Sequence, residues 1–377
     1  MSSCRVIVLG SLNVDLTLRS ARLPQVGETV IGGQFTRGWG GKGANQAWAA
    51  SQLARGRLFS GSVGLIAAVG NDEFGRAYRD KLRQEAIDTS HVATVDQPTG
   101  VACILVGQAG ENMISVASGA NSQLTASMVE AIPHDWFGDA RVFLTNLESP
   151  LEAVHCGLSR ARQAGLLTIL NPAPLTQESQ PFVVRELLPL TDIVTPNEIE
   201  AANLGAGIPD DLRSDRLRYV QDQLVRLFAG TIVITRGAHG CCCRGRSQRP
   251  WLEIPGEQVS SVDTTGAGDV FNGVLAACFA SDVGYAAAKL CRQTSLNPMS
   301  DGDALTVCSG PDKTDRDSRQ SDPRVWSDPR ASSDAGRTAL TAVLRMANFA
   351  AAHATTQFGA QGTLPAVEDL RRASLLL

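Results

Sequence analysis

Short apolar runs alternate with amphipathic stretches along most of the chain. Runs rich in Val, Ile and Leu predict β-strands at Val6–Leu9, Val63–Val69, Val101–Val106, Val142–Thr145, Leu166–Leu170, Asp192–Val194 and Thr231–Thr235. Stretches with helical periodicity occur between them at Glu73–Ala86, Leu151–Ala164, Asn197–Leu204 and Leu212–Phe228. Continuous apolar strands suit a parallel sheet that is buried on both faces. The alternation therefore predicts an α/β fold with a doubly wound, mostly parallel central sheet flanked by helices.

Two kinds of segment interrupt this alternation. Asp15–Phe35 and Gly100–Ser118 have the pattern of half-exposed, hairpin-forming strands, and we expect a small β-lid over the crevice at the carboxyl ends of the sheet strands. The segment from Ser309 to Arg337 is instead dense in Ser, Asp, Arg and Pro, a composition that buries too little apolar surface to order itself. We therefore predict a single domain, 1–377, with a disordered insert at about 295–337 and a helix that resumes at Thr338.

Composition and charge narrow the functional classes. The 377 residues contain 34 basic and 38 acidic side chains, a net charge of −4 that argues against nucleic acid or an anionic membrane as partner. The N-terminus leads directly into a strand-like run, which predicts no signal peptide. Nine scattered cysteines without a CxxC pair indicate reduced thiols and a cytoplasmic location. Cys241, Cys242 and Cys243 alternate across a predicted strand, so we expect buried or edge-strand thiols rather than a zinc site.

The strongest local motif occupies residues 263–273 and reads Asp-Thr-Thr-Gly-Ala-Gly-Asp-Val-Phe-Asn-Gly. A Gly-Ala-Gly turn that opens a helix points several backbone N–H groups outward at the positive end of the helix, which favours binding of a phosphoryl group. Asp269 would then lie within reach of the hydroxyl that attacks this group, as a general base. The alternative is a glycine turn whose Asp only complements the helix dipole.

A second motif, Gly-Gly-Lys-Gly-Ala-Asn-Gln-Ala, spans residues 40–47. Its glycines let a ligand approach the backbone, and Lys42 and Asn45 offer hydrogen-bond donors at a helix start. It is no Walker A loop, because Gly43 stands where Ser or Thr would bind Mg²⁺. Residues 10–13 do not complete a GxGxxG fingerprint either. P-loop nucleoside triphosphatases and NAD enzymes are therefore disfavoured.

The two motifs together resemble the signatures of the ribokinase family of carbohydrate kinases, also called the PfkB family. Further matches follow in the family's order, at residues 10–15, 88–92, 110–112, 119–121, 147–150, 196–200, 235–237 and 359–361. They cover about Arg5–Cys278 and Leu340–Leu370. The Gly-Lys-Gly-Ala-Asn-Gln-Ala version is more similar to kinases of ribose than to those of adenosine or fructose.

The resemblance implies roles for the matching residues. Those that would hold the sugar are Asn13, Val14, Asp15, Gly41, Lys42, Gly43, Ala44, Asn45, Glu148 and Asp269. Asp269 would also take the proton of the 5-hydroxyl, while N–H groups around Gly266, Ala267 and Gly268 receive the charge of the transferring phosphoryl group. Those that would contact ATP or position its hydrated Mg²⁺ are Asn197, Glu200, Thr235, Arg236, Gly237, Ala238, His239, Gly240, Gly268, Asp269 and Asn348.

Relatives of this kind also bind a monovalent cation, K⁺, beside the phosphoryl site. The matching positions are Asp263, Thr265, Ala354, Gln357, Gly359 and Thr363, most of which would act through backbone carbonyls. Gln357 stands where a basic residue is common. The family also implies a homodimer formed through the β-lid.

The implied activity is ATP-dependent phosphorylation of D-ribose at O5. Another sugar or nucleoside kinase of this family, acting on deoxyribose, fructose or adenosine, is one alternative. Lys42 and Asn45 favour a free pentose, since a nucleoside would need extra apolar surface for its base. A non-catalytic sugar-binding regulator is the other alternative, and a retained Asp269 argues against it because binding alone needs no general base.

Overall fold

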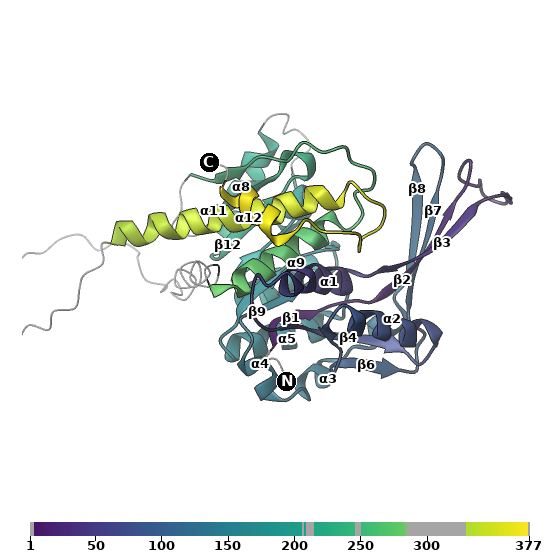
Figure 1. Ribbon diagram of the computed structural model, residues 1–377, viewed down its shortest axis with the longest axis horizontal. Coiled ribbons are helices and arrows are strands. Elements are labelled where there is room, and N and C mark those ends of the chain that lie inside the picture. Colours follow the sequence, from purple (N-terminus) through teal and green to yellow (C-terminus); the bar gives the residue numbers. More distant parts are fainter. Residues whose placement is uncertain are drawn as a thin grey trace, which may run out of the picture.

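Two β-sheets organise the part of the chain that the computed structural model describes, residues 4–205, 207–208, 215–245, 250–282, 284 and 329–375 (Figure 1). The central sheet has ten strands in the order β14-β13-β12-β11-β10-β9-β1-β4-β5, with β6 paired to β4. Its strands are β1 (Cys4–Leu9), β4 (Ser62–Gly70), β5 (Ile87–Asp88), β6 (Val92–Val95), β9 (Val142–Thr145), β10 (Leu167–Leu170), β11 (Ile193–Val194), β12 (Thr231–Thr235), β13 (Cys241–Arg244) and β14 (Leu252–Ile254).

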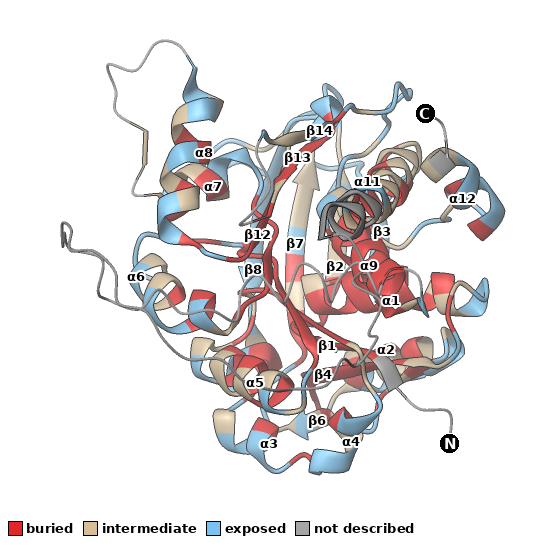
Figure 2. Cartoon of the chain, turned by 90° about the vertical axis from the view of Figure 1, so that its left-hand side faces the viewer, coloured by how far each residue is buried: buried red, intermediate tan, exposed pale blue. Residues whose placement is uncertain are grey.

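Parallel pairing runs from β12 to the β4 edge, and only β13 and β14 are antiparallel. Helices cover both faces, as Figure 2 shows. They are α1 (Lys42–Arg55), α2 (Glu73–Gln84), α3 (Ala126–Glu130), α4 (His134–Gly138), α5 (Leu151–Gln163), α6 (Gln180–Phe182), α7 (Glu198–Leu204), α8 (Arg216–Leu227), α9 (Ala267–Ala280), α11 (Pro329–Ala354) and α12 (Val367–Leu375). The predicted doubly wound α/β fold is confirmed.

The apolar strands supply one core on each face of the sheet. Side chains of successive strand residues point to opposite faces. Val6 and Val8 of β1 accordingly join a cluster with α1, α9 and α11, while Ile7 and Leu9 join a cluster with α5, α7 and α8. All four are fully buried. This two-sided burial explains why these strands read as continuous apolar runs.

Close packing between α1 and α9 brings the two sequence motifs together. A Cβ atom at Gly273 would lie 2.4 Å from the carbonyl oxygen of Gln46 and 2.7 Å from the Cβ of Ala49. Only a glycine therefore lets the two helices approach this closely. The first turn of α9, which carries Asp269, then faces the first turn of α1.

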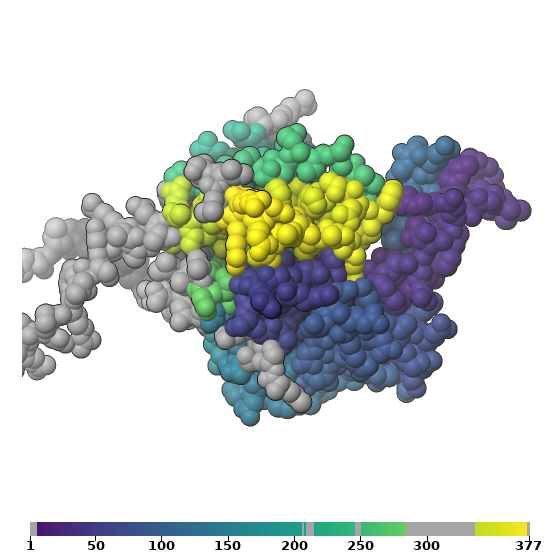
Figure 3. All heavy atoms as spheres, in the orientation of Figure 1, coloured from purple at the N-terminus to yellow at the C-terminus, as the bar shows by residue number. Residues whose placement is uncertain are grey.

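A second sheet of four strands, in the order β3-β2-β7-β8, projects from the body (Figures 1 and 3). It comprises β2 (Asn13–Arg19), β3 (Gln34–Gly40), β7 (Gly100–Val106) and β8 (Asn112–Ala117). The predicted lid segments are these strands, although β2 starts at Asn13 and β3 extends to Gly40. Strand β2 begins at Asn13, and β3 ends at Gly40, the first residue of the 40–47 motif. The lid therefore joins the body of the protein beside the candidate site.

The boundaries of the predicted insert need correction at its C-terminal side. Helix α11 begins at Pro329, not at Thr338. Proline is favoured in the first turn of a helix because its missing N–H is not needed there, so Pro329 can begin a helix inside a stretch of otherwise polar composition. The insert from 295 to 328, and the predicted start of a helix at Leu212, lie outside the described residues.

Within the ranges given above, none of the helices combines the length and the apolar character that crossing a membrane requires. Cys241, Cys242 and Cys243 are buried in β13, as predicted.

Candidate active site

Polar segments meet at the carboxyl-terminal edge of the parallel strands. The turn after β1 packs against the start of α1, where a Cβ atom at Gly43 would lie 2.4 Å from the carbonyl carbon of Gly10. The N–H of Ala44 donates to the carbonyl of Ser11 at 3.0 Å. The loop after β9 and the first turn of α9 are the other two segments that meet at this edge. Open α/β sheets bind ligands at this edge, so both motifs lie where a site is expected.

Asp269 is the buried centre of this group, with 6% of its surface exposed. Its Oδ2 accepts a hydrogen bond from Asn45 Nδ2 at 3.0 Å, and its Oδ1 accepts one from Gln46 Nε2 at 3.1 Å. Burial raises the pKa of Asp269, although the charge of Lys42 and these hydrogen bonds oppose the rise. A carboxylate with a raised pKa is a stronger base than an exposed one, which suits proton abstraction from a hydroxyl.

The two glycines in the turn before Asp269, Gly266 and Gly268, have different structural roles. Gly266 has φ 77°, and a Cβ atom there would lie 2.5 Å from the Cβ of Ala360, so this position requires glycine for the fold. A Cβ atom at Gly268 would meet nothing within 4 Å. The N–H of Ala267, the first of α9, donates to the carbonyl of Thr264 at 3.3 Å. Gly268 therefore borders open space in front of the next N–H groups of the helix, which have no acceptor in a preceding helical turn. An anionic group can reach them there.

Charged side chains surround Asp269. Glu148 Oε2 accepts the backbone N–H of Lys42 at 3.0 Å. Burial alone would lower the pKa of Lys42, but the charges of Asp269, Glu148 and Glu200 outweigh it and raise that pKa. Burial, with the charges of Glu148 and Asp269, raises the pKa of Asp15 to about 6. The structure thus joins Asp15, Lys42, Glu148 and Asp269 in one polar cluster.

Asn121 is a site residue whose role the sequence did not reveal. Its Nδ2 donates to Asn13 Oδ1 at 2.8 Å and to the carbonyl of Leu12 at 3.0 Å, while its Oδ1 accepts the N–H of Leu12 at 2.8 Å. A Cβ atom at Gly100 would lie 2.2 Å from Asn13 Oδ1. Asn121 therefore orients the predicted sugar ligand Asn13. The Gly-Ala-Asn match at 119–121 was its only signal.

Some predicted sugar residues can contribute only backbone atoms. Val14 and Ala44 are fully buried in the apolar core. Gly41 has φ 88°, and a Cβ atom there would lie 2.7 Å from the N atom of Asn13. Gly41 and Gly43 thus serve the close approach of two chain segments.

Asn197 and Glu200 begin α7 as a reciprocal pair. Asn197 Oδ1 accepts the N–H of Glu200 at 2.8 Å, and Glu200 Oε2 accepts the N–H of Asn197 at 2.9 Å. Burial raises the pKa of Glu200, against the hydrogen bond from Asn197 and the charge of Lys42. The pair is a helix cap, and its carboxylate interacts with the charges of Lys42 and Asp269.

The loop 235–240 follows β12 directly beside this pair. Thr235 N–H donates to the carbonyl of Pro196 at 2.9 Å. The Arg236 guanidinium forms ion pairs with Glu253 at 2.9 Å and Glu198 at 3.5 Å. Arg236 is therefore held by protein carboxylates, and its backbone remains the part that could face a nucleotide.

Asn348 ties α11 to the same region. It is buried, and its Nδ2 donates to the carbonyl of Pro255 at 2.9 Å. A Cβ atom at Gly256 would lie 1.9 Å from the carbonyl oxygen of Ala238, so this chain segment packs on the loop 235–240. The structure thus brings the predicted nucleotide residues together. Their contacts with ATP stay predictions.

The predicted cation residues also converge. Asp263 Oδ1 accepts the N–H of Thr265 at 2.9 Å, and Oδ2 accepts the N–H of Gly359 at 3.0 Å. Burial alone would raise the pKa of Asp263, but these hydrogen bonds outweigh it and lower that pKa. Gln357 N–H lies 3.4 Å from the Ala354 carbonyl. Gln357 Oε1 accepts the N–H of Thr363 at 3.0 Å. Among the described residues, no three His, Cys, Asp or Glu side chains form a group that could hold a metal ion.

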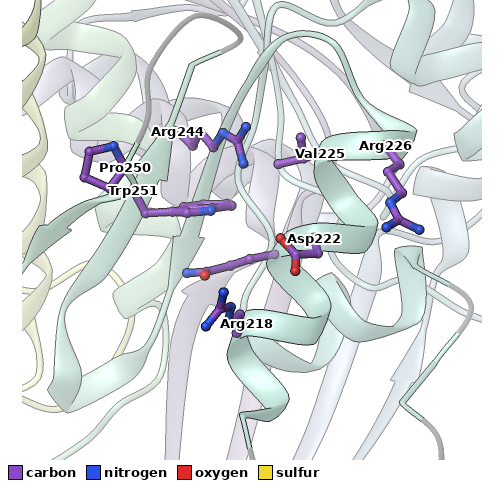
Figure 4. Close-up of a pocket in the computed structure, with 8 residues that line it drawn as sticks. Arg218, Asp222, Val225, Arg226, Arg244, Pro250 and Trp251 are labelled. Carbon is purple, nitrogen blue, oxygen red and sulfur yellow. The ribbon is translucent and has the colours of Figure 1, made fainter.

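A cavity of about 410 Å³ borders the charged cluster and is lined in part by Ser11, Asn13, Glu148 and Ser149. A larger one, about 600 Å³, lies between α8 and the β13–β14 hairpin (Figure 4). Its lining includes Arg218, Asp222, Arg244 and Trp251. It contains none of the predicted site residues, so size alone does not identify the active site.

Comparison with known proteins decides the family. A model described as pfkB family carbohydrate kinase matches residues 4–294. The chain belongs to this family. The kinase is therefore a phosphotransferase that acts on a sugar hydroxyl.

Curated relatives carry the names of pentose kinases. A ribokinase from Haemophilus influenzae is 38% identical over 71% of this chain and 82% of its own length. A ribokinase from Mus musculus is 36% identical over 72% of this chain and 80% of its own. A deoxyribokinase from Salmonella typhi is 33% identical over 73% of this chain and 84% of its own.

The structure of Arabidopsis thaliana ribokinase complexed with ribose and ATP resembles this chain with a TM-score of 0.69, 20% identity and 100% coverage of both chains. At that identity the likeness shows the ribokinase-like fold.

Proposed function

We propose that the kinase transfers the γ-phosphoryl group of ATP to O5 of D-ribose, giving D-ribose 5-phosphate. The observation that carries this proposal is buried Asp269, next to the open side of Gly268 and within the charge field of Lys42 and Glu148, two residues predicted to bind the sugar. The names of the curated relatives support ribose as the acceptor.

The proposed reaction is an in-line transfer. Asp269 takes the proton of the sugar 5-hydroxyl as O5 forms its bond to the γ-phosphorus, and the bond to the β-phosphate oxygen breaks to release ADP. The N–H groups at the start of α9 face the charge that develops on the phosphoryl oxygens. Asn45 donates a hydrogen bond to Oδ2 of Asp269, so this oxygen of the base is held before the sugar binds.

A competition experiment tests the acceptor. Initial rates with ATP and ribose, 2-deoxyribose, fructose or adenosine would be measured in one coupled assay. We expect kcat/KM for ribose to exceed that for the others by at least about tenfold, because a lost hydrogen bond to a buried charged group costs about 1.5–3 kcal/mol. A preference for 2-deoxyribose would reassign the substrate within the family, and no rate with any sugar would favour the non-catalytic alternative.

Asp15 makes ribose binding depend on pH. Its carboxylate would accept hydroxyl hydrogens, so with a pKa of about 6 the affinity for ribose falls as the pH drops below that value.

Burying the ionised form of Asp15 also costs stability. The folded state holds the proton more tightly than the unfolded state, so the free energy of unfolding falls as the pH rises from 3.8 to about 6.

We therefore expect Asp15→Asn to raise Tm at pH 7 and to weaken ribose binding by at least about tenfold. Calorimetric titration between pH 5 and 8 checks the binding, with Asp80→Asn on α2 as a surface control. Unchanged ribose affinity in Asp15→Asn would remove Asp15 from the sugar site.

Mg²⁺ belongs to the proposed reaction through ATP. Glu200 supplies one half-buried carboxylate whose charge interacts with that of Lys42, and Mg²⁺ that keeps several waters needs only one or two. Asn197 and Glu200 would thus hold the hydrated ion, which neutralises phosphate charge when bound. The cap between them fixes the orientation of the Glu200 carboxylate before ATP arrives.

K⁺ is proposed as an activator. The Asp263 carboxylate joins the chain before α9 to the loop 355–363, and carbonyl and carboxylate oxygens are the donors that hard cations prefer. A cation held there would keep the glycine turn in the orientation that faces the phosphoryl group. Activity should rise when K⁺ replaces Na⁺ or Tris at constant ionic strength, and Asp263→Ala should abolish that rise. Equal rates in all three salts would contradict the site.

The lid carries an apolar row that supports a homodimer. The strand register places Phe35, Leu18, Leu105 and Met113 opposite one another across the four strands, hence on one face. Phe35, Leu18 and Met113 are 61%, 45% and 55% exposed. We propose that a second copy covers this row. Leu18→Asp with Met113→Asp should give a monomer by light scattering, where Asp80→Asn does not. A monomeric parent protein would contradict the proposal.

The cysteines support a reducing, cytoplasmic location. Within the described residues Cys103, Cys156, Cys241, Cys242, Cys243 and Cys278 are free thiols. Such thiols persist where the compartment keeps them reduced.

A further inference from the structure

Gln46 is a fully buried residue of the second motif for which no role in the reaction has been given. Its Nε2 donates to Asp269 Oδ1 at 3.1 Å and to Asn171 Oδ1 at 3.1 Å. Its Oε1 accepts a hydrogen bond from Asn146 Nδ2 at 3.3 Å. All three polar partners are themselves buried, so this amide exchanges no hydrogen bond with water.

Backbone groups fix the direction of this amide from both sides. Asn171 Nδ2 donates to the carbonyl of Thr195 at 3.1 Å, and a carbonyl can only accept, so Asn171 must turn its oxygen to Gln46. Asn146 Oδ1 accepts the N–H of Glu148 at 3.1 Å, and an N–H can only donate, so Asn146 must turn its nitrogen to Gln46. The NH₂ group of Gln46 is therefore obliged to face Asp269.

We propose that Gln46 is a positioning residue for the general base: it holds Asp269 Oδ1 so that the carboxylate plane and its ionised form are set before the sugar arrives. Asn171 and Asn146 anchor Gln46 to the ends of the sheet strands. The Asn146 contact also links the base to Glu148 of the sugar site. This inference rests on the proposed function of Asp269.

Other charged groups act on the same carboxylate and must be kept in place. Lys42 from α1 favours its ionised form, and Glu148 from the loop after β9 disfavours it. Asp15 of β2 and Glu200 of α7 interact with its charge too. A substitution at Gln46 leaves all four of these charges in place. Its effect on the pKa of Asp269 can therefore be attributed to the lost hydrogen bond.

The experiment uses Gln46→Leu, which removes the amide and keeps a side chain of similar size. We expect kcat to fall about 10–100-fold, because a displacement of about 1 Å at the reacting group can cost 10²-fold, while KM for ribose changes less than about threefold. The acidic limb of the pH–rate profile should move to higher pH, since a hydrogen bond that favours the carboxylate is lost. Gln52→Leu on the same helix is the matched control, because its amide binds Glu85 instead.

Two further measurements keep the inference falsifiable. The ¹³C carboxyl signal of Asp269, titrated without substrates, should show a higher pKa in Gln46→Leu than in the parent protein. If Gln46→Leu does not fold, Asn171→Ala frees the same amide while leaving Gln46 present, and should lower kcat without changing KM for ribose.

A folded variant with parental kcat and an unchanged Asp269 titration overturns the positioning role. If the parent protein phosphorylates no sugar, the proposed function fails. The Asp269 titration still decides whether Gln46 holds the carboxylate.

Discussion

Asp269→Asn lowers kcat for phosphoryl transfer by about 10²–10⁴-fold, the range that removal of a general base produces, while KM for ribose changes much less. An amide cannot take the proton of O5. It also cannot satisfy both neighbours, because Asn45 and Gln46 each donate a hydrogen bond to this side chain and one of them would meet the new NH₂ group. Rates at saturating ATP and ribose, with Tm as the folding check, measure the effect.

Asp222→Asn on α8 is the matched control for this substitution, because it makes the same chemical change outside the charged cluster. Its kcat should remain within about twofold of the parent, as expected for a surface change. A rate above half of the parental rate in Asp269→Asn would show that Asp269 is not the base.

Gly268→Ala separates a binding role from a folding role at the glycine turn. Gly268 belongs to α9, and its Cβ atom would meet nothing within 4 Å, so the fold should tolerate alanine. Alanine is the better helix former by up to about 1 kcal/mol, and Tm should stay the same or rise. The added methyl group would nevertheless occupy the space where the phosphoryl group approaches. We expect kcat/KM for ATP to fall at least about tenfold, a loss of about 1.4 kcal/mol.

Gly266→Ala gives the opposite pattern and serves as the comparison. Its φ of 77° is left-handed, and its Cβ atom would collide with Ala360, so the substitution should lower the free energy of unfolding by about 1–3 kcal/mol or more. Thermal unfolding and ATP kinetics on both variants provide the measurement. Parental kcat/KM for ATP in Gly268→Ala would mean that the phosphoryl group lies elsewhere.

The sequence alone predicted the sheet because burial on both faces leaves a continuous apolar signature. The predicted strand Val142–Thr145 matches β9 in full, and Val6–Leu9 lies within β1, which begins two residues earlier at Cys4. The glycine motifs predicted where the site lies, since Gly43 and Gly273 are required by contacts that leave no room for a side chain. Helix α1 lacked a comparable signature, because its buried face is made largely of alanine and small residues.

Long-range polar pairing could not be predicted from the sequence. Asn121 and Asn13 are far apart in the chain, as are Gln46 and Asn171. The presence of Asn or Gln in a sequence does not indicate which residue its side-chain amide will bind. The amide of Asn348, predicted to flank the nucleotide, binds the backbone at Pro255. Burial decides such roles, and burial is a property of the assembled fold.

Identification of the product is the most direct test of the central claim. The kinase would be incubated with ATP, Mg²⁺ and ribose, and the product examined by ³¹P NMR with proton coupling. The account predicts a phosphomonoester coupled to the two protons of C5, formed by the parent protein and not by Asp269→Asn. A phosphate coupled to the single proton of C1, or equal product from Asp269→Asn, would contradict transfer to O5 by this base.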